Sequence, residues 1–203
     1  MIEFRFNEYL STITINRPEK ANALTPDMLH ALNDAVLKAR GSRAVILTGV
    51  GKVFSAGADL DFIDSGIAAD PIWEELSQTV ADLPGLTVCA LNGTLAGGAF
   101  GMALACDIRI AVPDARFFYP VIKMGVQPPP SDPARMKALI GPSRTKMLLL
   151  TGQKIDSQVA QRWGLIDNTT TPGGLMDYAQ SLVAAARATP LTLLRSIKGS
   201  IGG

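Results

Sequence analysis

Two glycine-centred turns carry the residues of this sequence that could do chemistry. Residues 54–60 (FSAGADL) follow the apolar stretch AVILT, and residues 92–101 (NGTLAGGAFG) follow the apolar stretch TVCAL. Glycine lets a ligand approach the main chain closely, and a helix that begins at Gly98 would leave unpaired N–H groups at its positive end. Two N–H groups held in place could stabilise the negative charge that develops on a thioester oxygen when an enolate or a tetrahedral species forms.

Each turn taken alone is better explained as a tight turn of small residues that favour packing. Neither turn has the GxGxxG spacing of a dinucleotide site, and no GK[ST] sequence follows that would indicate a phosphate loop. Both turns nevertheless lie between an expected strand and an expected helix, which is where α/β proteins present ligand sites.

The composition is that of a globular protein with a substantial core. The chain has 203 residues, of which 47% are hydrophobic and 18% are charged, with a formal net charge of +1. This balance argues against broad electrostatic binding of nucleic acid or of an anionic membrane. No metal site is expected, because the sequence has one histidine, His30, and no CxxC. Cys89 and Cys106 lie in apolar surroundings, which favours buried free thiols over a disulfide.

No targeting or membrane-spanning segment is expected in the sequence. Residues 1–10 lack the basic start and apolar core of a signal peptide. The longest apolar run, residues 95–106, is too short and too rich in glycine to cross a bilayer. We therefore expect a cytoplasmic protein.

Strands alternate with helices early in the chain, and helices dominate later, which predicts one α/β domain over residues 1–203. The core covers about residues 1–170, and C-terminal helices cover about residues 173–199. Residues 2–15 alternate as in a β-hairpin, and Thr25 caps a helix that leaves His30 on its polar face. Buried strands are expected at residues 44–48, 87–91 and 108–112. Helices are expected at residues 72–83, 98–106, 132–140, 143–150, 157–163, 175–188 and 191–198.

Four segments in a fixed order together resemble the crotonase family, also called the enoyl-CoA hydratase/isomerase family. They are NRPEKANAL at residues 16–24, AVILTG, FSAGADL and NGTLAGGAFGMALACDIRIA. The similarity continues through Gly125, Arg135, residues 141–152 and residues 160–166, and so covers nearly the whole chain. The resemblance implies a spiral of ββα units around two roughly perpendicular sheets, here with a shortened C-terminal helical region.

The resemblance also implies a site that binds an acyl-coenzyme A thioester of fatty acid metabolism. It makes the N–H groups of Ala58 and Gly98 the oxyanion hole. It places four residues near the nucleotide end of coenzyme A: Arg17, Lys20, Ala21 and Ala23. Arg17 and Lys20 could meet phosphate groups, or they could be solvated loop charges. Coenzyme A would enter as part of the substrate, and no permanently bound cofactor is expected.

A homo-oligomer, a trimer or a hexamer, is implied as well. Similar proteins carry further C-terminal helices, so part of the acyl pocket is expected to come from a second subunit or to stay open. The apolar late helices, at residues 147–150 and 191–194, fit an interface.

The carboxylates that similar enzymes use are missing at their expected positions. Hydratases of the family activate water with one glutamate and relay a proton to the α-carbon with another. These positions fall at Gly101 and Val121, and the acid that some isomerases use instead falls at Pro129. We therefore expect hydration of crotonyl-CoA to be slow or undetectable.

The other groups near these positions are weak catalytic candidates. Asp61 and Asp64 are expected to face solvent. Asp132 is expected to cap a helix or to meet its dipole, although it could reach inward if the proline run before it redirects the loop. Tyr119 could donate a hydrogen bond, but an aromatic side chain in FFYP is more often part of the core.

Three functions remain open. The first is a lyase or isomerase that acts on acyl-CoA through enolate stabilisation, which the oxyanion hole favours. The second is a binding protein with little turnover, which the missing acids favour. The third is hydrolysis or decarboxylation of a thioester, in which water or the substrate supplies the proton. We favour an enzyme at the level of the family.

Overall fold

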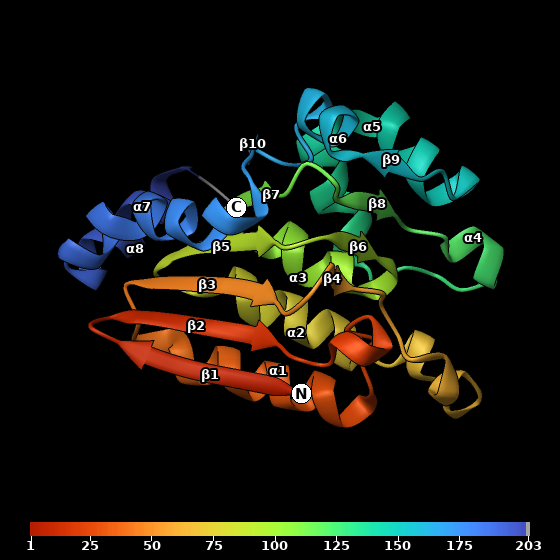
Figure 1. The fold of residues 1–203 in the computed structure, drawn as a ribbon, viewed down its shortest axis with the longest axis horizontal. Helices are drawn as coiled ribbons and strands as arrows, with labels where there is room; N and C mark the ends of the chain where they lie inside the picture. The colour runs from red at the N-terminus through yellow and green to blue at the C-terminus, as the bar shows by residue number, and fades with distance from the viewer. Residues whose placement is uncertain (202–203) are drawn as a thin grey trace.

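The computed structural model describes residues 1–201, apart from the side chains of residues 64 and 65, and shows two β-sheets with helices around them (Figure 1). Within these residues the strand order is β1-β2-β3-β5-β7-β10 in the larger sheet and β4-β6-β8-β9 in the smaller one. The larger sheet consists of β1 (Ile2–Asn7), β2 (Leu10–Ile15), β3 (Ala44–Gly49), β5 (Leu86–Leu91), β7 (Ile108–Ala111) and β10 (Asn168–Thr169). The smaller sheet consists of β4 (Val53–Ser55), β6 (Thr94–Ala96), β8 (Arg116–Phe118) and β9 (Ile155–Asp156).

The chain alternates between the two sheets as it advances. β4 follows β3, β6 follows β5 and β8 follows β7, so each of these strands of the large sheet is succeeded by a short strand of the small sheet. The α-helices that come after these pairs are α2 (Ile72–Ala81), α3 (Phe100–Ala105) and α4 (Val121–Met124). This repeat is a ββα spiral, and the predicted fold class is confirmed.

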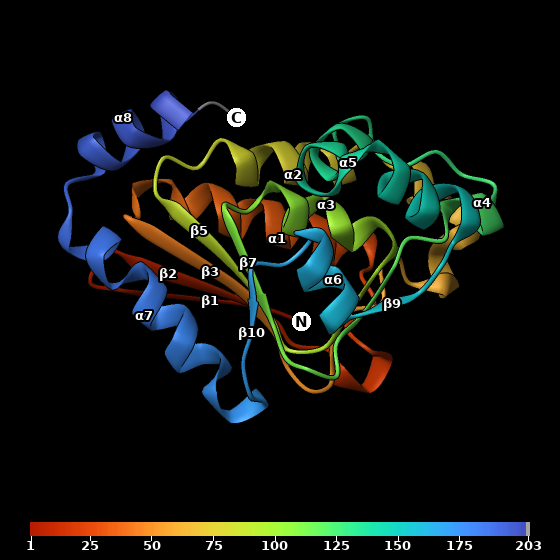
Figure 2. The ribbon, with the colours of Figure 1, turned by 90° about the horizontal axis from the view of Figure 1, so that it is seen from above.

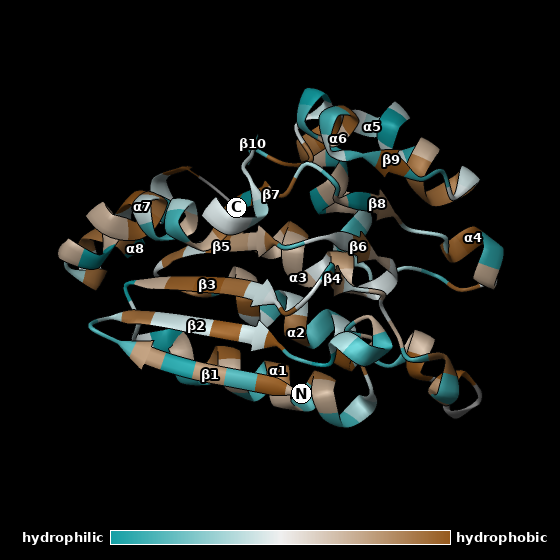
Figure 3. Cartoon of the chain, viewed as in Figure 1, coloured by the Kyte–Doolittle hydropathy of each residue, from teal (hydrophilic) through white to brown (hydrophobic). Residues whose placement is uncertain are grey.

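The large sheet lies between two layers of helices. α1 (Pro26–Lys38), α2 and α3 pack side by side over one face, and α7 (Leu175–Ala188) covers the other face (Figure 2). Because both faces are covered, β3 and β5 are buried along nearly their whole length and are apolar without alternation (Figure 3). The edge strand β1 alternates in sequence between apolar and polar residues, and its last four residues are exposed.

The remaining helices cover the small sheet and the end of the chain. They are α5 (Ser131–Thr151), α6 (Ser157–Trp163) and α8 (Leu191–Ile201). Gly141 interrupts α5 with a φ of 79°, and a proline follows, so α5 is the two helices that the sequence predicts here. α8 has no buried residue, and Lys198 ties it to the body with hydrogen bonds to the carbonyl oxygens of Leu83 and Gly85.

Most sequence-based expectations for the elements are confirmed. The hairpin, the Thr25 cap and the exposed His30 are present, and Cys89 and Cys106 are buried free thiols. The segment expected as a helix over residues 98–106 is a 3₁₀ turn followed by α3. The short strands of the small sheet were not predicted residue by residue. Among the described residues, no helix combines the length and apolar character needed to span a membrane.

Candidate functional site

The loop at residues 17–24 holds the first glycine turn in place. Leu24 donates its N–H to the Gly57 carbonyl at 2.8 Å, and its own carbonyl accepts the N–H of Asp59 at 2.9 Å. The hydroxyl of Ser55 accepts the N–H of Gly57 at 3.1 Å. Ala58 therefore sits between two residues whose backbones are fixed, and its N–H has no acceptor among residues 1–201.

The second turn lies directly against the first. Gly57 has a φ of +90°, and a Cβ atom there would lie 3.2 Å from the Cα of Gly97, so only glycine allows this approach. After Gly97 the chain enters the 3₁₀ turn that leads into α3, and the N–H of Gly98 at its start finds no acceptor within the described residues. Two unpaired N–H groups thus belong to two turns in van der Waals contact.

Trp73 closes one side of the second turn. A Cβ atom at Gly98 would lie 2.9 Å from the Cε3 atom of Trp73, so the indole ring rests on the glycine backbone. The ring is fixed because its Nε1–H donates to the Ile67 carbonyl at 2.7 Å. Trp73 was not among the predicted site residues, since a tryptophan at a core-facing helix position carries no local sign of a site.

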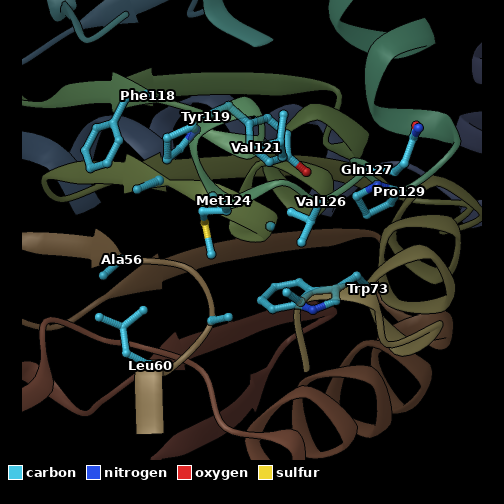
Figure 4. Close-up of a pocket in the computed structure, with 16 residues that line it drawn as sticks. Ala56, Leu60, Trp73, Phe118, Tyr119, Val121, Met124, Val126, Gln127 and Pro129 are labelled. Atoms are coloured by element: carbon cyan, nitrogen blue, oxygen red, sulfur yellow. The ribbon is translucent and has the colours of Figure 1, made fainter. Parts of the chain in front are cut away.

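A mainly apolar pocket opens at the two turns. Its cavity volume is about 80 Å³, and both Ala58 and Gly98 line it. Figure 4 shows two opposed walls around this space. One wall contains Ala56, Leu60 and Trp73, and the other contains Phe118, Tyr119, Val121, Met124, Val126, Gln127 and Pro129. Such a pocket can hold a small apolar group beside two backbone donors.

The sequence matches one family over nearly its whole length. Residues 5–201 match the sequence profile described as Enoyl-CoA hydratase/isomerase. The chain belongs to this family. YngF of Bacillus subtilis is 36% identical to it over 205 residues, which cover 96% of this chain and 78% of YngF.

Two further members of the enoyl-CoA hydratase/isomerase family illustrate the similarity. The crotonyl-CoA hydratase of Syntrophomonas wolfei is 33% identical over 184 residues, covering 86% of this chain and 71% of the relative. The solved structure of an enoyl-CoA hydratase from Bacillus anthracis matches with a TM-score of 0.90 at 28% identity, covering 100% of this chain and 82% of that chain.

The charged residues of the loop before the first turn make internal contacts. Arg17 donates from Nη1 to Asp59 Oδ2 at 2.5 Å and to the Ala23 carbonyl at 2.9 Å, and its side chain is mostly buried. The hydrogen bond that Arg17 donates to the Asp59 carboxylate is the main reason that the pKa of Asp59 is lowered. Lys20 is exposed and lies 3.4 Å from Asp61 Oδ2. Arg17 thus joins the loop to the first glycine turn, and Lys20 is the freer of the two cations.

The three positions of the missing acids are placed differently. Val121 and Pro129 line the pocket with apolar side chains. Gly101 lies on α3 and is buried. A Cβ atom at Gly101 would lie 3.0 Å from Asp132 Oδ1 and 3.3 Å from the side chain of Ser77. The Asp132 carboxylate, which belongs to α5, therefore lies next to the position that a Cβ atom of residue 101 would occupy.

The expectation that Asp132 caps a helix is wrong, although Asp132 does lie in the first turn near the positive end of the helix dipole, and the structure shows the alternative in which its side chain reaches inward. Asp132 is in the first turn of α5, but its side chain makes no capping hydrogen bond and is completely buried. Three prolines, at residues 128–130, precede α5, and the side chain of Asp132 points into the protein. Its Oδ2 accepts the Tyr119 hydroxyl at 2.7 Å, while Oδ1 has no hydrogen-bond partner in the part of the chain that the structure describes. Burial, as the largest cause, raises the pKa of Asp132 to about 7.

Tyr119 connects this buried carboxylate to the pocket. It is 1% exposed, its ring stacks on Phe100 with centroids 5.1 Å apart, and it is one of the pocket-lining residues. Burial, followed by the charge of Asp132, raises the pKa of Tyr119, so its hydroxyl stays protonated. The expectation that Tyr119 belongs to the core is correct, yet the same residue also reaches the site. Local sequence patterns could not pair Tyr119 with Asp132, because the pairing depends on where β8 ends relative to α5.

Of the other acids, Asp61 is exposed as expected, and the expectation for Asp64 lies outside what the structure describes. In the described part of the chain, no group of three or more His, Cys, Asp or Glu side chains could hold a metal ion.

Proposed function

We propose that the protein is an enzyme that binds an acyl-coenzyme A thioester and stabilises its enolate through the N–H groups of Ala58 and Gly98. One observation carries the proposal: both N–H groups lack an acceptor within residues 1–201, and both residues line the same apolar pocket. Fixed donors in such surroundings stabilise developing negative charge more strongly than water does, because they need no reorganisation. Coenzyme A enters with the substrate, and the proposal needs no resident cofactor.

The pocket supports proton transfer at carbon better than addition of water. Water needs a base within hydrogen-bond reach, and neither Val121 nor Pro129 offers one. We therefore favour an isomerase-like reaction, in which a proton leaves the α-carbon and returns to the same carbon or to another carbon of the enolate. The same two apolar residues also favour the second candidate, a binding protein with little turnover. A panel of crotonyl-CoA, a 3-enoyl-CoA, a malonyl-type CoA and a saturated acyl-CoA separates these functions from hydrolysis and decarboxylation.

The loop at residues 17–24 is proposed to contact the nucleotide end of coenzyme A. Ala21 and Ala23 lie in this loop beside the first turn, and they would offer backbone groups to the ligand. Lys20 is exposed, whereas Arg17 is already engaged by Asp59, so Lys20 is the better candidate for a phosphate contact. The role of Arg17 would then be to hold the loop rather than to bind phosphate.

Calorimetry tests binding and the role of Lys20 together. Wild-type protein should bind butyryl-CoA, and butyrate should bind far more weakly. Lys20→Ala should weaken butyryl-CoA binding by several-fold and leave binding of butyryl-N-acetylcysteamine, which lacks the nucleotide, unchanged. Lys38→Ala, an exposed lysine on α1, is the matched control. Absence of saturable binding with several CoA thioesters would refute the proposal.

A pair of substitutions at Gly98 tests the oxyanion hole. Gly98→Pro removes the N–H, and Gly98→Ala keeps it while adding the same Cβ atom against Trp73. The difference between the two variants therefore isolates the donor. Loss of one such donor typically costs about 3–4 kcal/mol of transition-state stabilisation, or roughly 10²–10³-fold in rate. Ala58→Ser retains its donor and should have a milder effect. Equal turnover in folded Gly98→Pro and Gly98→Ala would mean that the site lies elsewhere.

A further inference from the structure

We propose that the Tyr119 hydroxyl exchanges the proton with the substrate carbon, and that Asp132 orients this hydroxyl and holds the second proton behind it. The inference rests on the proposed function, since it assumes an enolate held by Ala58 and Gly98. It assigns the acid–base role to two residues from different parts of the fold: Tyr119 follows β8, and Asp132 begins α5.

The first observation is the position of the Asp132 carboxylate. Gly101 stands where a glutamate is expected from the resemblance to hydratases, and Asp132 Oδ1 lies 3.0 Å from the point at which a Cβ atom of residue 101 would be. The acid that α3 lacks is therefore replaced by an acid delivered from the start of α5. The absence of a side chain at Gly101 is what leaves room for it.

The second observation is that Tyr119 stands between Asp132 and the pocket. Asp132 is completely buried and is not among the pocket-lining residues, so it cannot meet a substrate in this structure. Tyr119 does line the pocket, on the wall opposite Trp73 (Figure 4). Its hydroxyl donates to Asp132 Oδ2 at 2.7 Å, an ordinary hydrogen-bond length along which a proton can be transferred. Tyr119 is thus the catalytic group, and Asp132 acts through it.

The proton movements balance without water or any co-reactant. When the α-carbon loses its proton, the C–H electron pair moves towards the thioester oxygen. The N–H groups of Ala58 and Gly98 donate hydrogen bonds to this oxygen and stabilise its negative charge. The proton passes to the Tyr119 oxygen while the Tyr119 hydroxyl proton passes to Asp132. The reverse movement returns a proton to the α-carbon, or to the γ-carbon of a conjugated enolate. In the second case the result is a 1,3-shift of the double bond, with no net gain or loss of protons.

The surroundings of Asp132 keep both of its protonation states accessible. Burial and the carboxylate of Glu74 on α2 favour the neutral acid, whereas the Tyr119 hydrogen bond and Arg135 on α5 favour the carboxylate. Arg135 is itself anchored, since it donates to the hydroxyls of Ser77 and Ser131. The resulting pKa of about 7 lets Asp132 accept and return a proton near neutral pH. The unpartnered Oδ1 can carry the proton when the acid is neutral.

The test is exchange of the α-protons of butyryl-CoA in D₂O, followed by NMR. Tyr119→Phe keeps the ring that stacks on Phe100 but loses the hydroxyl, and it should slow exchange by about 10²–10⁴-fold. Affinity for butyryl-CoA, measured by calorimetry, should change little. Tyr178→Phe is the matched control, because Tyr178 is not among the pocket-lining residues and its hydroxyl accepts a hydrogen bond from Asn168.

The pH profile of exchange separates a proton-holding role of Asp132 from a merely structural one. Removal of the α-proton requires the carboxylate, so wild-type exchange should rise with pH and level off above about 7. Asp132→Asn should lower the rate and abolish this transition, whereas the exposed control Asp114→Asn should preserve both.

Three results would overturn the inference. The first is exchange by Tyr119→Phe at the wild-type rate. The second is a pH transition that survives in Asp132→Asn. The third is wild-type protein that binds butyryl-CoA but exchanges no α-proton. Each of these leaves the proposed binding of acyl-CoA intact. Absence of binding by the wild type would refute the proposed function together with the inference.

Discussion

Replacing Asp132 by asparagine should make the folded protein markedly more stable at alkaline pH relative to the wild type. The pKa of Asp132 is raised from 3.8 to about 7 on folding, mainly by burial. Between these two values the folded state keeps a proton that the unfolded state has lost, so stability falls as pH rises. Each pH unit costs about 1.4 kcal/mol, and the full penalty, present above pH 7, is roughly 4 kcal/mol.

Asparagine has no charge to bury, and its carbonyl oxygen can still accept the Tyr119 hydroxyl. The measurement is urea unfolding of wild type and Asp132→Asn at pH 5 and pH 8. From pH 5 to pH 8 the wild type should lose about 3 kcal/mol relative to the variant, corresponding to the two pH units below the folded-state pKa. Asp114→Asn, which changes an exposed carboxylate, should show no such pH-dependent difference. A constant difference between wild type and Asp132→Asn at both pH values would show that Asp132 is ionised throughout or not desolvated.

Three further predictions concern catalysis, packing and assembly. Crotonyl-CoA hydration should be at least about 10²-fold slower than in a relative that carries both glutamates, because Gly101 and Val121 cannot activate water. Equal rates of the two proteins in parallel spectrophotometric assays would refute this prediction. Gly101→Glu should lower the free energy of unfolding by about 1–3 kcal/mol, because the new side chain collides with Asp132 Oδ1. In a double-mutant cycle, adding Asp132→Gly to this variant should restore part of the lost stability. The protein should form a homo-oligomer, since Leu193, Ile197 and other apolar side chains of α8 are exposed; a monomer mass in light scattering at micromolar concentration would contradict this.

The sequence by itself was sufficient for the fold class and for the turns of the site. Continuous apolar stretches such as AVILT predict strands covered on both faces, and the structure buries β3 in this way. The order of the motifs indicated the family, and the family match over residues 5–201 confirms it. The strands and turns could be predicted because they depend on residues that are neighbours in the chain, whose hydrophobicity and backbone preferences are local properties, whereas the ββα spiral was implied by the resemblance to the family.

Only the tertiary structure decided which side chains meet around the site. The contact between Gly57 and Gly97 depends on how β4 and β6 pair, and these strands are too short to leave a periodic signal. Trp73 reaches the pocket from a helix that by its sequence looks like an ordinary core helix.

Asp132 shows the difference most clearly. Its neighbours in the sequence, Ser131 and Pro133, favour a helix start with the carboxylate as a cap, and α5 does begin there. The carboxylate is nevertheless buried against Tyr119, in a space that Gly101 on another helix leaves open and that Asp132 borders together with Ser77 of α2. The space at Gly101 and the carboxylate of Asp132 meet only in the folded chain. The burial of Asp132, and with it the raised pKa of its carboxyl group, is therefore a property of the tertiary structure.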